Sequence, residues 1–316
     1  MNLSFRDLEY FLTLAELGHM GRAAAVHGIT QPALSKSLRR LEEETGLTLF
    51  ERSSRRLWLS ASGLAFVEHA RQLHAQYQDA LRNTSALQAG HAGLLRIGAT
   101  GVTLDAIVTP ALTWLMPRRP ALKACLTVGL SDTLFDQVLH GKLDLVVAPL
   151  YGGPATGLDH YVLKQDTMRI VLSARHPLLE SAAPQLADTL AFPWILPLAG
   201  SSARATLMNC FAEQGLPEPR AAMEVPLISA GILEIVATTQ FLSFAPEPLI
   251  AQAGGGRISA LSFTLPQQRK LCLLARQGAS WTPLMEAFRD AVEGSVATAQ
   301  EGPADTDSRT TSRRDC

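Results

Sequence analysis

Amide, hydroxyl and basic side chains follow one another closely from Gln31 onward. Gln31 and Ser35 are four positions apart, so they share one face of a predicted helix, with Lys36 and Arg39 beside them. Pro32 falls in the first turn of that helix, where a proline is tolerated. Amides and hydroxyls can form hydrogen bonds with the edges of bases, whereas Lys and Arg neutralise phosphates. The pattern predicts a helix that presents a polar N-terminal end to double-stranded DNA.

Short flanking elements are predicted to hold this helix in place. Apolar residues over 8–15 recur with helical spacing, and a short Ala-rich helix is expected over 20–26. Residues 49–59 then form two short apolar arms around a basic tip, which is typical of a hairpin or wing. The basic residues of this segment are Arg52, Arg55 and Arg56. The alternative is that all these polar residues form an ordinary solvated surface.

A long helix is predicted over residues 62–89, with Ser60 and Ser62 as its caps. Its seam residues are spaced four and three apart in turn, which is the heptad pattern of a coiled coil. These residues are Phe66, Ala70, Leu73, Tyr77, Ala80, Thr84 and Leu87. A helix of this length spans about 42 Å and would bury little against a small domain. We therefore expect a homodimer through residues 62–89; the alternative is packing against the helix's own chain.

From residue 94 onward, predicted strands alternate with predicted helices. This alternation indicates βαβ units, an α/β fold and a mostly parallel sheet. Strands are expected at 94–98, 122–130, 143–148, 168–174, 194–198, 221–225, 241–245 and 271–275. Helices are expected at 104–116, 133–140, 186–190, 204–214, 229–238 and 283–292. Residues 294–316 hold few apolar side chains, so we expect a disordered tail there.

Composition and charge limit the classes of protein to which the chain can belong. Of its 316 residues, 47% are hydrophobic, and 28 Lys+Arg against 29 Asp+Glu give a net charge of −1. This balance excludes intrinsic disorder for most of the chain and provides material for sizeable cores. No apolar run reaches the roughly 18 residues of a membrane span, and the N-terminus lacks the pattern of a signal peptide. We expect a soluble, cytoplasmic protein with no membrane partner.

Patterns typical of catalysis, metal binding or disulfide bonding are missing from the sequence. Cys125, Cys210, Cys272 and Cys316 form no C-x-x-C pair, and Cys210 has no neighbouring cysteine to resolve an oxidised thiol. The run Gly254–Gly256 lacks the spacing of a phosphate loop, and neither G-x-S-x-G nor H-E-x-x-H occurs. We therefore predict no enzyme, no catalytic residues, no metal and no cofactor.

The sequence resembles LysR-type transcriptional regulators. The resemblance runs through residues 7–11, 23–25, 31–35, 41–42, 46, 49–52 and 59–63, and extends more weakly over 94–292. It implies a winged helix-turn-helix, a dimerising linker helix and a two-lobed effector domain like that of periplasmic binding proteins. It also implies promoter DNA as a partner of a dimer or tetramer, a small co-inducer between the lobes, and RNA polymerase as a further candidate partner. One departure is His19–Gly21, where the family usually has Ser or Asn before an apolar residue.

The resemblance assigns boundaries and contacts to this chain. The DNA-binding domain would occupy 1–60, the linker helix 61–90 and the effector domain 91–293. Within the effector domain, one lobe would cover about 94–162 and 266–293 and the other about 163–265. The major-groove contacts would be Gln31, Pro32, Ser35, Lys36 and Arg39. The wing and DNA-backbone contacts would be Arg52, Arg55 and Arg56.

A ligand site is predicted on the loops of the two lobes, because ligands of such folds bind beyond the carboxyl ends of strands. The candidate residues are Thr100, Gly101, Val102, Thr103, Ser131, Ser201, Ser202, Leu227 and Phe244. Several are hydroxyl residues at predicted helix N-termini, a setting that favours a carboxylate, so a small organic acid is the expected ligand class. The alternative for each Ser or Thr is an ordinary helix cap, and Arg204 is either a ligand contact or a surface residue.

Together these features predict a sequence-specific, DNA-binding transcriptional regulator whose activity a small molecule modulates. The alternative is a solute-binding or sensing module without specific DNA binding. Residues 1–60 favour the first function, because a pure binding protein needs no wing.

Overall fold

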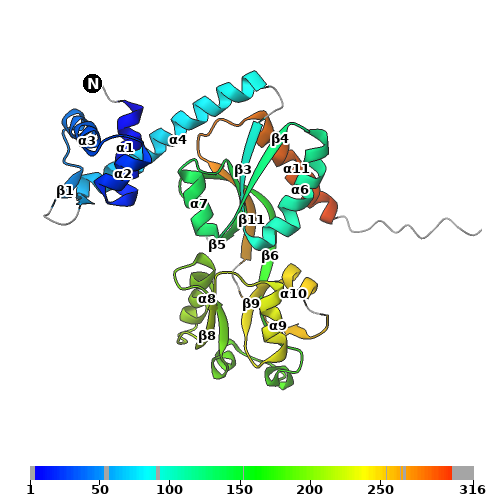
Figure 1. Cartoon of the computed structure of the whole chain (residues 1–316). Coiled ribbons are helices and arrows are strands. Elements are labelled where there is room, and N and C mark those ends of the chain that lie inside the picture. The colour runs from blue at the N-terminus through cyan, green and yellow to red at the C-terminus, as the bar shows by residue number, and fades with distance from the viewer. Residues whose placement is uncertain are drawn as a thin grey trace, which may run out of the picture. The chain divides into compact units, whose positions relative to one another are not determined.

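The computed structural model describes residues 4–52, 57–89, 93–151, 153–253, 255–263, 265 and 268–300. The chain divides into two compact units, Met1–Gln88 with Leu139–Lys142, and Ala89–Val138 with Leu143–Cys316 (Figure 1). Each unit has a hydrophobic core of its own. The two units are therefore described separately.

The first unit contains the predicted three short helices and hairpin. The helices are α1 (Phe5–Leu17), α2 (Met20–Val26) and α3 (Gln31–Thr45), and the strands β1 (Phe50–Arg52) and β2 (Leu57–Leu59) pair antiparallel. Ser4 caps the start of α1, Thr30 caps α3, and Gly18 ends α1 with a φ of 59°. His19 replaces the expected Ser cap of α2: its Nδ1 accepts the N–H groups of Gly21 and Arg22 at 3.1 and 3.3 Å. The departure from the family pattern therefore leaves the start of α2 intact.

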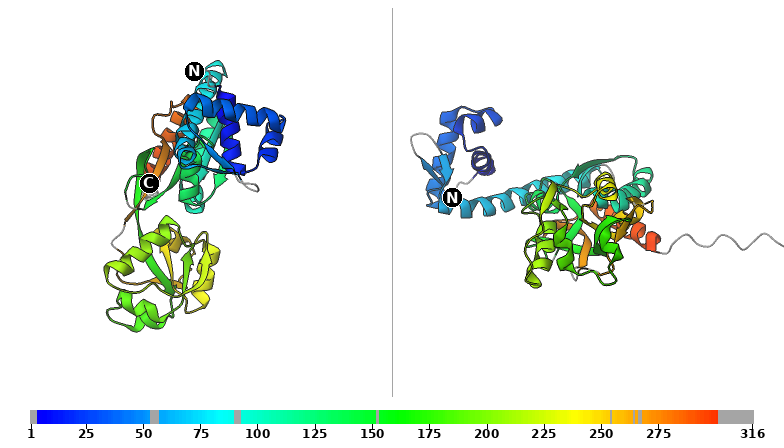
Figure 2. Two further views of the ribbon diagram at one scale, coloured as in Figure 1. Left: turned by 90° about the vertical axis from the view of Figure 1, so that its left-hand side faces the viewer. Right: turned by 90° about the horizontal axis from the view of Figure 1, so that it is seen from below.

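The long helix α4 (Ala61–Ala89) begins one residue before its predicted start and is locked to the hairpin there (Figure 2). Ser60 Oγ accepts the N–H of Gly63 at 2.9 Å, and Ser60 N–H donates to the carbonyl of Leu49 at 3.0 Å. A Cβ at Gly63 would lie 2.0 Å from that carbonyl oxygen. Position 63 therefore requires glycine.

The predicted seam of α4 divides into two sets of side chains. Phe66, Ala70 and Tyr77 pack against their own unit, and the Tyr77 ring stacks on that of Phe5 with centroids 4.0 Å apart. In contrast, Leu73 is 48% exposed, as is Leu81 beside the seam. Packing within the chain thus accounts for part of the pattern and leaves an apolar strip uncovered. Leu87 lies outside the residues whose side chains the structure describes.

The first lobe of the second unit is a sheet covered by helices on both faces. Strands β3 (Gly93–Ala99), β4 (Leu122–Val128) and β5 (Leu145–Tyr151) are parallel, and β11 (Gln268–Arg276) runs antiparallel to β5. The helices α6 (Thr109–Leu115) and α11 (Pro283–Gln300) pack together on one face (Figures 1 and 2). Helix α7 (Ser131–Leu139) covers the other face, where Leu134 contacts the sheet beside Gly98.

Strand β6 (Leu158–Ser173) joins the two lobes. Its residues from Leu158 to Thr167 pair with β11, whereas Met168–Ser173 pair with β9 (Ser243–Pro246) and β10 (Ile258–Ala260). In the second lobe, strands β7 (Trp194–Pro197) and β8 (Ala221–Val225) pair with each other in parallel. Helix α8 (Ser202–Glu213) packs on one side of these strands, and α9 (Ala230–Thr238) and α10 (Glu247–Ala253) pack on the other.

The structure differs from the sequence prediction in several elements. The sheets are mixed rather than mostly parallel, because β6, β9, β10 and β11 all pair antiparallel. Strand β6 begins ten residues before the predicted strand, and α10 and β10 were not predicted. Helix α11 continues past Val292 to Gln300, since Val296 extends its apolar face, so the expectation of disorder is wrong for 294–300. Residues 301–316 lie outside the described part of the chain, in which no helix is long and apolar enough to cross a membrane.

The helical segment between β3 and β4 is continuous but irregular. It passes through α5 (Gly101–Thr103), the π-helical turn η1 (Leu104–Val108), α6 and the 3-10 turn η2 (Met116–Arg118). The prediction began this helix at Leu104, three residues after its actual start. The π-helical turn η1 therefore follows directly, in chain order, after the residues 100–103 that were assigned to a ligand site. Such turns are frequent at functional sites.

His176 is buried in the second lobe as a neutral ring. It is 2% exposed, its Nδ1 accepts the N–H of Leu178 at 3.2 Å, and its Nε2 lies 3.2 Å from the carbonyl oxygen of Gln240. The ring also packs edge-on against Phe192. Burial lowers the pKa of His176 below 6.5, although the hydrogen bond to Gln240 opposes this shift.

We predict that His176 makes the second lobe less stable in acid. As pH falls through 6.5, the unfolded chain takes up this proton before the folded chain does, so stability that is present above this pH is lost below it. Thermal unfolding from about pH 7 to about pH 5 should therefore show a steeper loss of Tm in the wild type than in His176→Asn, whose side chain still caps the turn. His160→Asn at an exposed position is the control, and parallel curves for all three proteins would refute the prediction.

Candidate DNA-binding surface and ligand cavity

The predicted contact residues of α3 lie together on an exposed face. Gln31, Pro32, Lys36 and Arg39 are exposed and Ser35 is half-buried. The opposite face of the helix buries Leu34, Leu38 and Leu41 in the core. This division follows from the apolar spacing of α3, which leaves its first turn and polar stripe available to a partner. The contacts of these residues with DNA stay a prediction.

A buried carboxylate fixes the orientation of α3. Asp7 in α1 is 2% exposed and accepts hydrogen bonds from Ser37 Oγ and from Arg40, whose Nε lies 3.1 Å from Oδ2. These hydrogen bonds raise the pKa of Arg40. Arg40 thus serves to hold α3 against α1. Arg39, by contrast, lies 3.5 Å from Glu43 with both side chains well exposed.

The hairpin is present, but its tip is not described. Phe50 pairs with Leu59, Glu51 with Trp58 and Arg52 with Leu57. The side chain of Arg52 and the whole of Arg55 and Arg56 lie outside the described residues. Their assignment to DNA contacts is therefore still a prediction.

We predict that Asp7→Ala lowers both the stability of the first unit and its affinity for DNA. The loss of the charged acceptor of Ser37 should cost about 1–3 kcal/mol in the free energy of unfolding, since Ser37 is buried. Denaturant unfolding and fluorescence anisotropy with duplex DNA would measure the two effects. The control is Glu43→Ala on the exposed face of α3, which should change stability by less than about 0.5 kcal/mol. Equal results for both variants would contradict a positioning role for Asp7.

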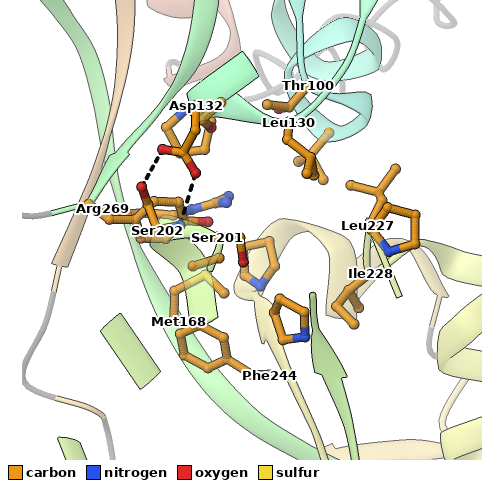
Figure 3. Close-up of a pocket in the computed structure, with 18 of the residues that line it drawn as sticks. Thr100, Leu130, Asp132, Met168, Ser201, Ser202, Leu227, Ile228, Phe244 and Arg269 are labelled. Carbon is orange, nitrogen blue, oxygen red and sulfur yellow. Dashed lines mark hydrogen bonds between the residues drawn. The ribbon is translucent and has the colours of Figure 1, made fainter. Parts of the chain in front are cut away.

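A cavity with a free volume of about 90 Å³ lies between the two lobes (Figure 3). Seven of the nine residues predicted to contact a ligand line it: Thr100, Val102, Ser131, Ser201, Ser202, Leu227 and Phe244. The other two lie behind this surface. Thr103 is fully buried and donates to the carbonyl of Val147 at 2.6 Å, and a Cβ at Gly101 would lie 2.7 Å from Leu227.

The starts of two long helices meet at this cavity. Ser131 is the first residue of α7, and Ser201 caps α8 by accepting the N–H of Arg204 at 3.3 Å. Helix N-termini carry partial positive charge and free N–H groups, which suits an anionic group. Met168, Leu227 and Phe244 provide an apolar surface beside them. The cavity therefore combines donors for an acid with room for hydrocarbon.

Two charged residues of the cavity escaped the sequence analysis. Asp132 in α7 accepts the N–H of Ser202 at 3.0 Å and also its hydroxyl proton. Arg269, which is 4% exposed, donates to both carboxylate oxygens of Asp166. Burial alone lowers the pKa of Arg269, but its interactions with Asp166 and Tyr151 outweigh burial and raise the pKa overall. Asp132 directly follows a predicted site residue, Ser131, which is the one sequence signal that pointed to it.

Arg204 faces away from the cavity. Its guanidinium lies 3.4 Å from Glu224, 3.6 Å from Glu218 and 3.3 Å from the carbonyl oxygen of Pro197. Arg204 is not among the residues that line the cavity. Arg204 therefore fits neither predicted alternative: it does not line the cavity, and its side chain is only 11% exposed, so it is not a surface residue either.

The buried cysteines lack the ionisation that redox chemistry needs. Burial raises the pKa of both Cys210 and Cys272 to about 11, so both are thiols at neutral pH. A thiol is a poor nucleophile toward peroxide compared with a thiolate. Over the ranges that the structure describes, no three His, Cys, Asp or Glu side chains gather as metal ligands.

Comparison with known proteins places both units in one family. Residues 5–64 match the bacterial regulatory helix-turn-helix proteins of the lysR family, and residues 88–297 match the LysR substrate binding domain. The HTH-type transcriptional regulator GbpR of Azospirillum brasilense is 34% identical over 235 residues, covering 73% of this chain and 69% of GbpR. The SDS degradation transcriptional activation protein of a Pseudomonas species is 32% identical over 297 residues, covering 90% of this chain and 94% of its own.

Solved structures share the fold. Full-length OxyR from Pseudomonas aeruginosa aligns with a TM-score of 0.62 at 22% identity, covering 92% of this chain and 95% of OxyR. CbnR in complex with its target DNA aligns with a TM-score of 0.57 at 21% identity, covering 92% and 99% of the two chains. From these matches and the two sites, we conclude that the chain belongs to the LysR family of transcriptional regulators, with a helix-turn-helix DNA-binding domain and an effector-binding domain.

Proposed function

We propose that the chain binds particular promoter sequences through α3 and the hairpin, and that a small molecule in the cavity between the lobes modulates this activity. The observation that carries the proposal is the coexistence of two sites on one chain. One is an exposed polar helix face held in place by Asp7, and the other is a partly apolar cavity at the starts of α7 and α8. The setting would be the cytoplasm, where promoter DNA is accessible.

We infer that the effector is a small organic acid. The start of α8 already receives one carboxylate, that of Asp132, through the N–H and hydroxyl of Ser202. An acid of matching size could use the same donors, because an N-terminal helix turn stabilises negative charge. Met168, Leu227 and Phe244 would then receive its hydrocarbon part.

We further propose that α4 forms a homodimer through residues 62–89. Leu73 and Leu81 are both 48% exposed, and their spacing of eight positions places them on the same side of α4. A second copy of α4 would cover them with its own apolar strip. A tetramer and contact with RNA polymerase would be further assemblies of the same regulator.

The first test is a pull-down of genomic DNA fragments with the purified protein, followed by sequencing of the retained fragments. Recovery of a few promoter sites with imperfect inverted repeats would support sequence-specific regulation by a symmetric dimer. Equal retention of all fragments, or of none, would contradict it and favour a solute-binding or sensing module. A thermal-shift screen of small carboxylic acids, with the matching neutral amides as controls, would then test the ligand class.

We predict different effects for two neighbouring residues of α3. Ser35→Ala should reduce the preference for the specific site over random DNA by about 1–3 kcal/mol, because Ser35 is placed to reach a base edge. Lys36→Ala should weaken both complexes alike and lower the slope of log affinity against log salt by about 1, because a lysine neutralises a phosphate. Anisotropy titrations at several salt concentrations would measure both quantities. Lys123→Ala in β4 is the control, and identical profiles for the two α3 variants would refute the division.

We predict that Leu73→Asp dissociates the dimer. A charge in the apolar strip should raise the dimer dissociation constant by at least about tenfold, which sedimentation velocity would show as a shift toward monomer. Leu73 is a cleaner position than Tyr77, because Tyr77 also stacks on Phe5 within the chain. Gln72→Asp adds the same charge about 100° around α4 from Leu73 and should leave the dimer intact; dissociation of both variants, or of neither, would rule out this interface.

A further inference from the structure

The contact between Asp132 and Ser202 ties the two lobes together across the cavity. We propose that it is a latch: it holds the lobes closed without effector, and an acidic effector opens it by taking the place of Asp132 at Ser202. This inference rests on the proposed function, since it assumes a ligand in this cavity. It adds a competitor within the chain itself to the proposed acid site.

The latch joins elements of different lobes. Asp132 is the second residue of α7 in the first lobe, and Ser202 is the first residue of α8 in the second. The carboxylate accepts the N–H of Ser202 at 3.0 Å and its hydroxyl proton as well (Figure 3). Asp132 is half-buried, so its side chain has solvent on one side into which it can turn when displaced.

A second contact closes the cavity on another side. Leu227 of the second lobe sits so close to Gly101 of the first that a Cβ there would lie 2.7 Å from the Leu227 side chain. Val102 packs against the apolar cluster of the second lobe that contains Ile228 and Leu233. Figure 3 shows Leu227 and Ile228 across the cavity from Asp132 and Ser202. The closed state is therefore held at two places, one polar and one apolar.

The cavity is small in the present arrangement of the lobes. Its free volume is about 90 Å³, whereas a cavity of about 150 Å³ holds benzene. Separation of the lobes would enlarge it for an aromatic or longer aliphatic acid. Such a separation would break the hydrogen bonds between Asp132 and Ser202.

Charge makes the acid and Asp132 mutually exclusive. Two carboxylates close together repel each other and cannot both stay ionised at low cost. Arg269 is the basic residue among the described lining residues, and Asp166 already occupies two of its nitrogen atoms. A ligand carboxylate at the start of α8 would therefore compete for the donors of Ser202 that Asp132 now uses.

The latch can be tested without knowing the effector, with acetate as the probe. The full chain and its Asp132→Ala variant would be compared by hydrogen exchange of peptides covering residues 198–206 and by thermal unfolding. Removal of the carboxylate should speed exchange at Ser202 about tenfold and lower Tm by about 2–4 °C. Sodium acetate should slow exchange at Ser202 again in Asp132→Ala, because it supplies the missing acceptor, but Tm should stay lowered, because acetate does not rejoin the lobes. Sodium chloride at equal ionic strength and neutral acetamide should not slow exchange.

Control variants separate the latch from general effects of charge or folding. Asp136→Ala removes an exposed carboxylate of the same helix and should behave like the wild type in every condition. Asp132→Asn keeps the size of the side chain and an oxygen acceptor, so it should lose part of the protection and respond less to acetate. Ser202→Ala should weaken the latch with Asp132 intact and should show no rescue by acetate.

Each outcome decides one part of the proposal. If Asp132→Ala matches Asp136→Ala in exchange and Tm, there is no latch. If exchange is faster but acetate leaves it unchanged, displacement by an acid is wrong. These results are independent of the promoter pull-down, which needs neither acetate nor these variants. Failure of the latch and failure of the proposed regulation can therefore be told apart.

Discussion

The ion pair between Arg269 and Asp166 is the constraint on which the effector domain depends. The two residues are partners in the pairing of β11 with β6, one position before β6 leaves its first-lobe partner between Thr167 and Met168. Both are almost fully buried, and a buried charge is tolerated only when it is paired and hydrogen-bonded. The pair therefore fixes the register of the two strands at the point where the lobes join. It also places a cation in the wall of the cavity, so one interaction sets both the junction and the charge of the site.

The contact between Asp132 and Ser202 can be released, whereas the ion pair between Arg269 and Asp166 is fixed. Arg269 is held by a carboxylate of a neighbouring strand that cannot move without breaking the sheet. Asp132 is held by one residue of the opposite lobe, and its other side is open to solvent. A fixed pair at the junction and a releasable pair at the opening are what a two-lobed binding domain needs to change between closed and open states.

Local signals in the sequence predicted the DNA-binding unit well. Its caps at Ser4, Gly18 and Thr30 act on residues no more than four positions away, so these caps can be recognised from the sequence alone. The same holds for Ser201 and Ser229, which cap α8 and α9. Strand β6 was only partly predicted, because polar residues such as Lys164 and Asp166 interrupt its apolar pattern where it pairs with β11. The roles of Asp132 and Arg269 were hidden for a different reason: their partners lie 70 and 103 positions away in the chain.

The contact at Gly63 has a mechanical consequence. The backbone of Leu49 in front of the hairpin and the first turn of α4 approach so closely that not even a methyl group fits between them. This close packing and the hydrogen bonds of Ser60 join the hairpin to the start of α4, so we expect the two to move together. In a dimer built on α4, a change in the angle between the two α4 helices would also move the two hairpins. The distance between the two DNA-binding domains on DNA would then change as well.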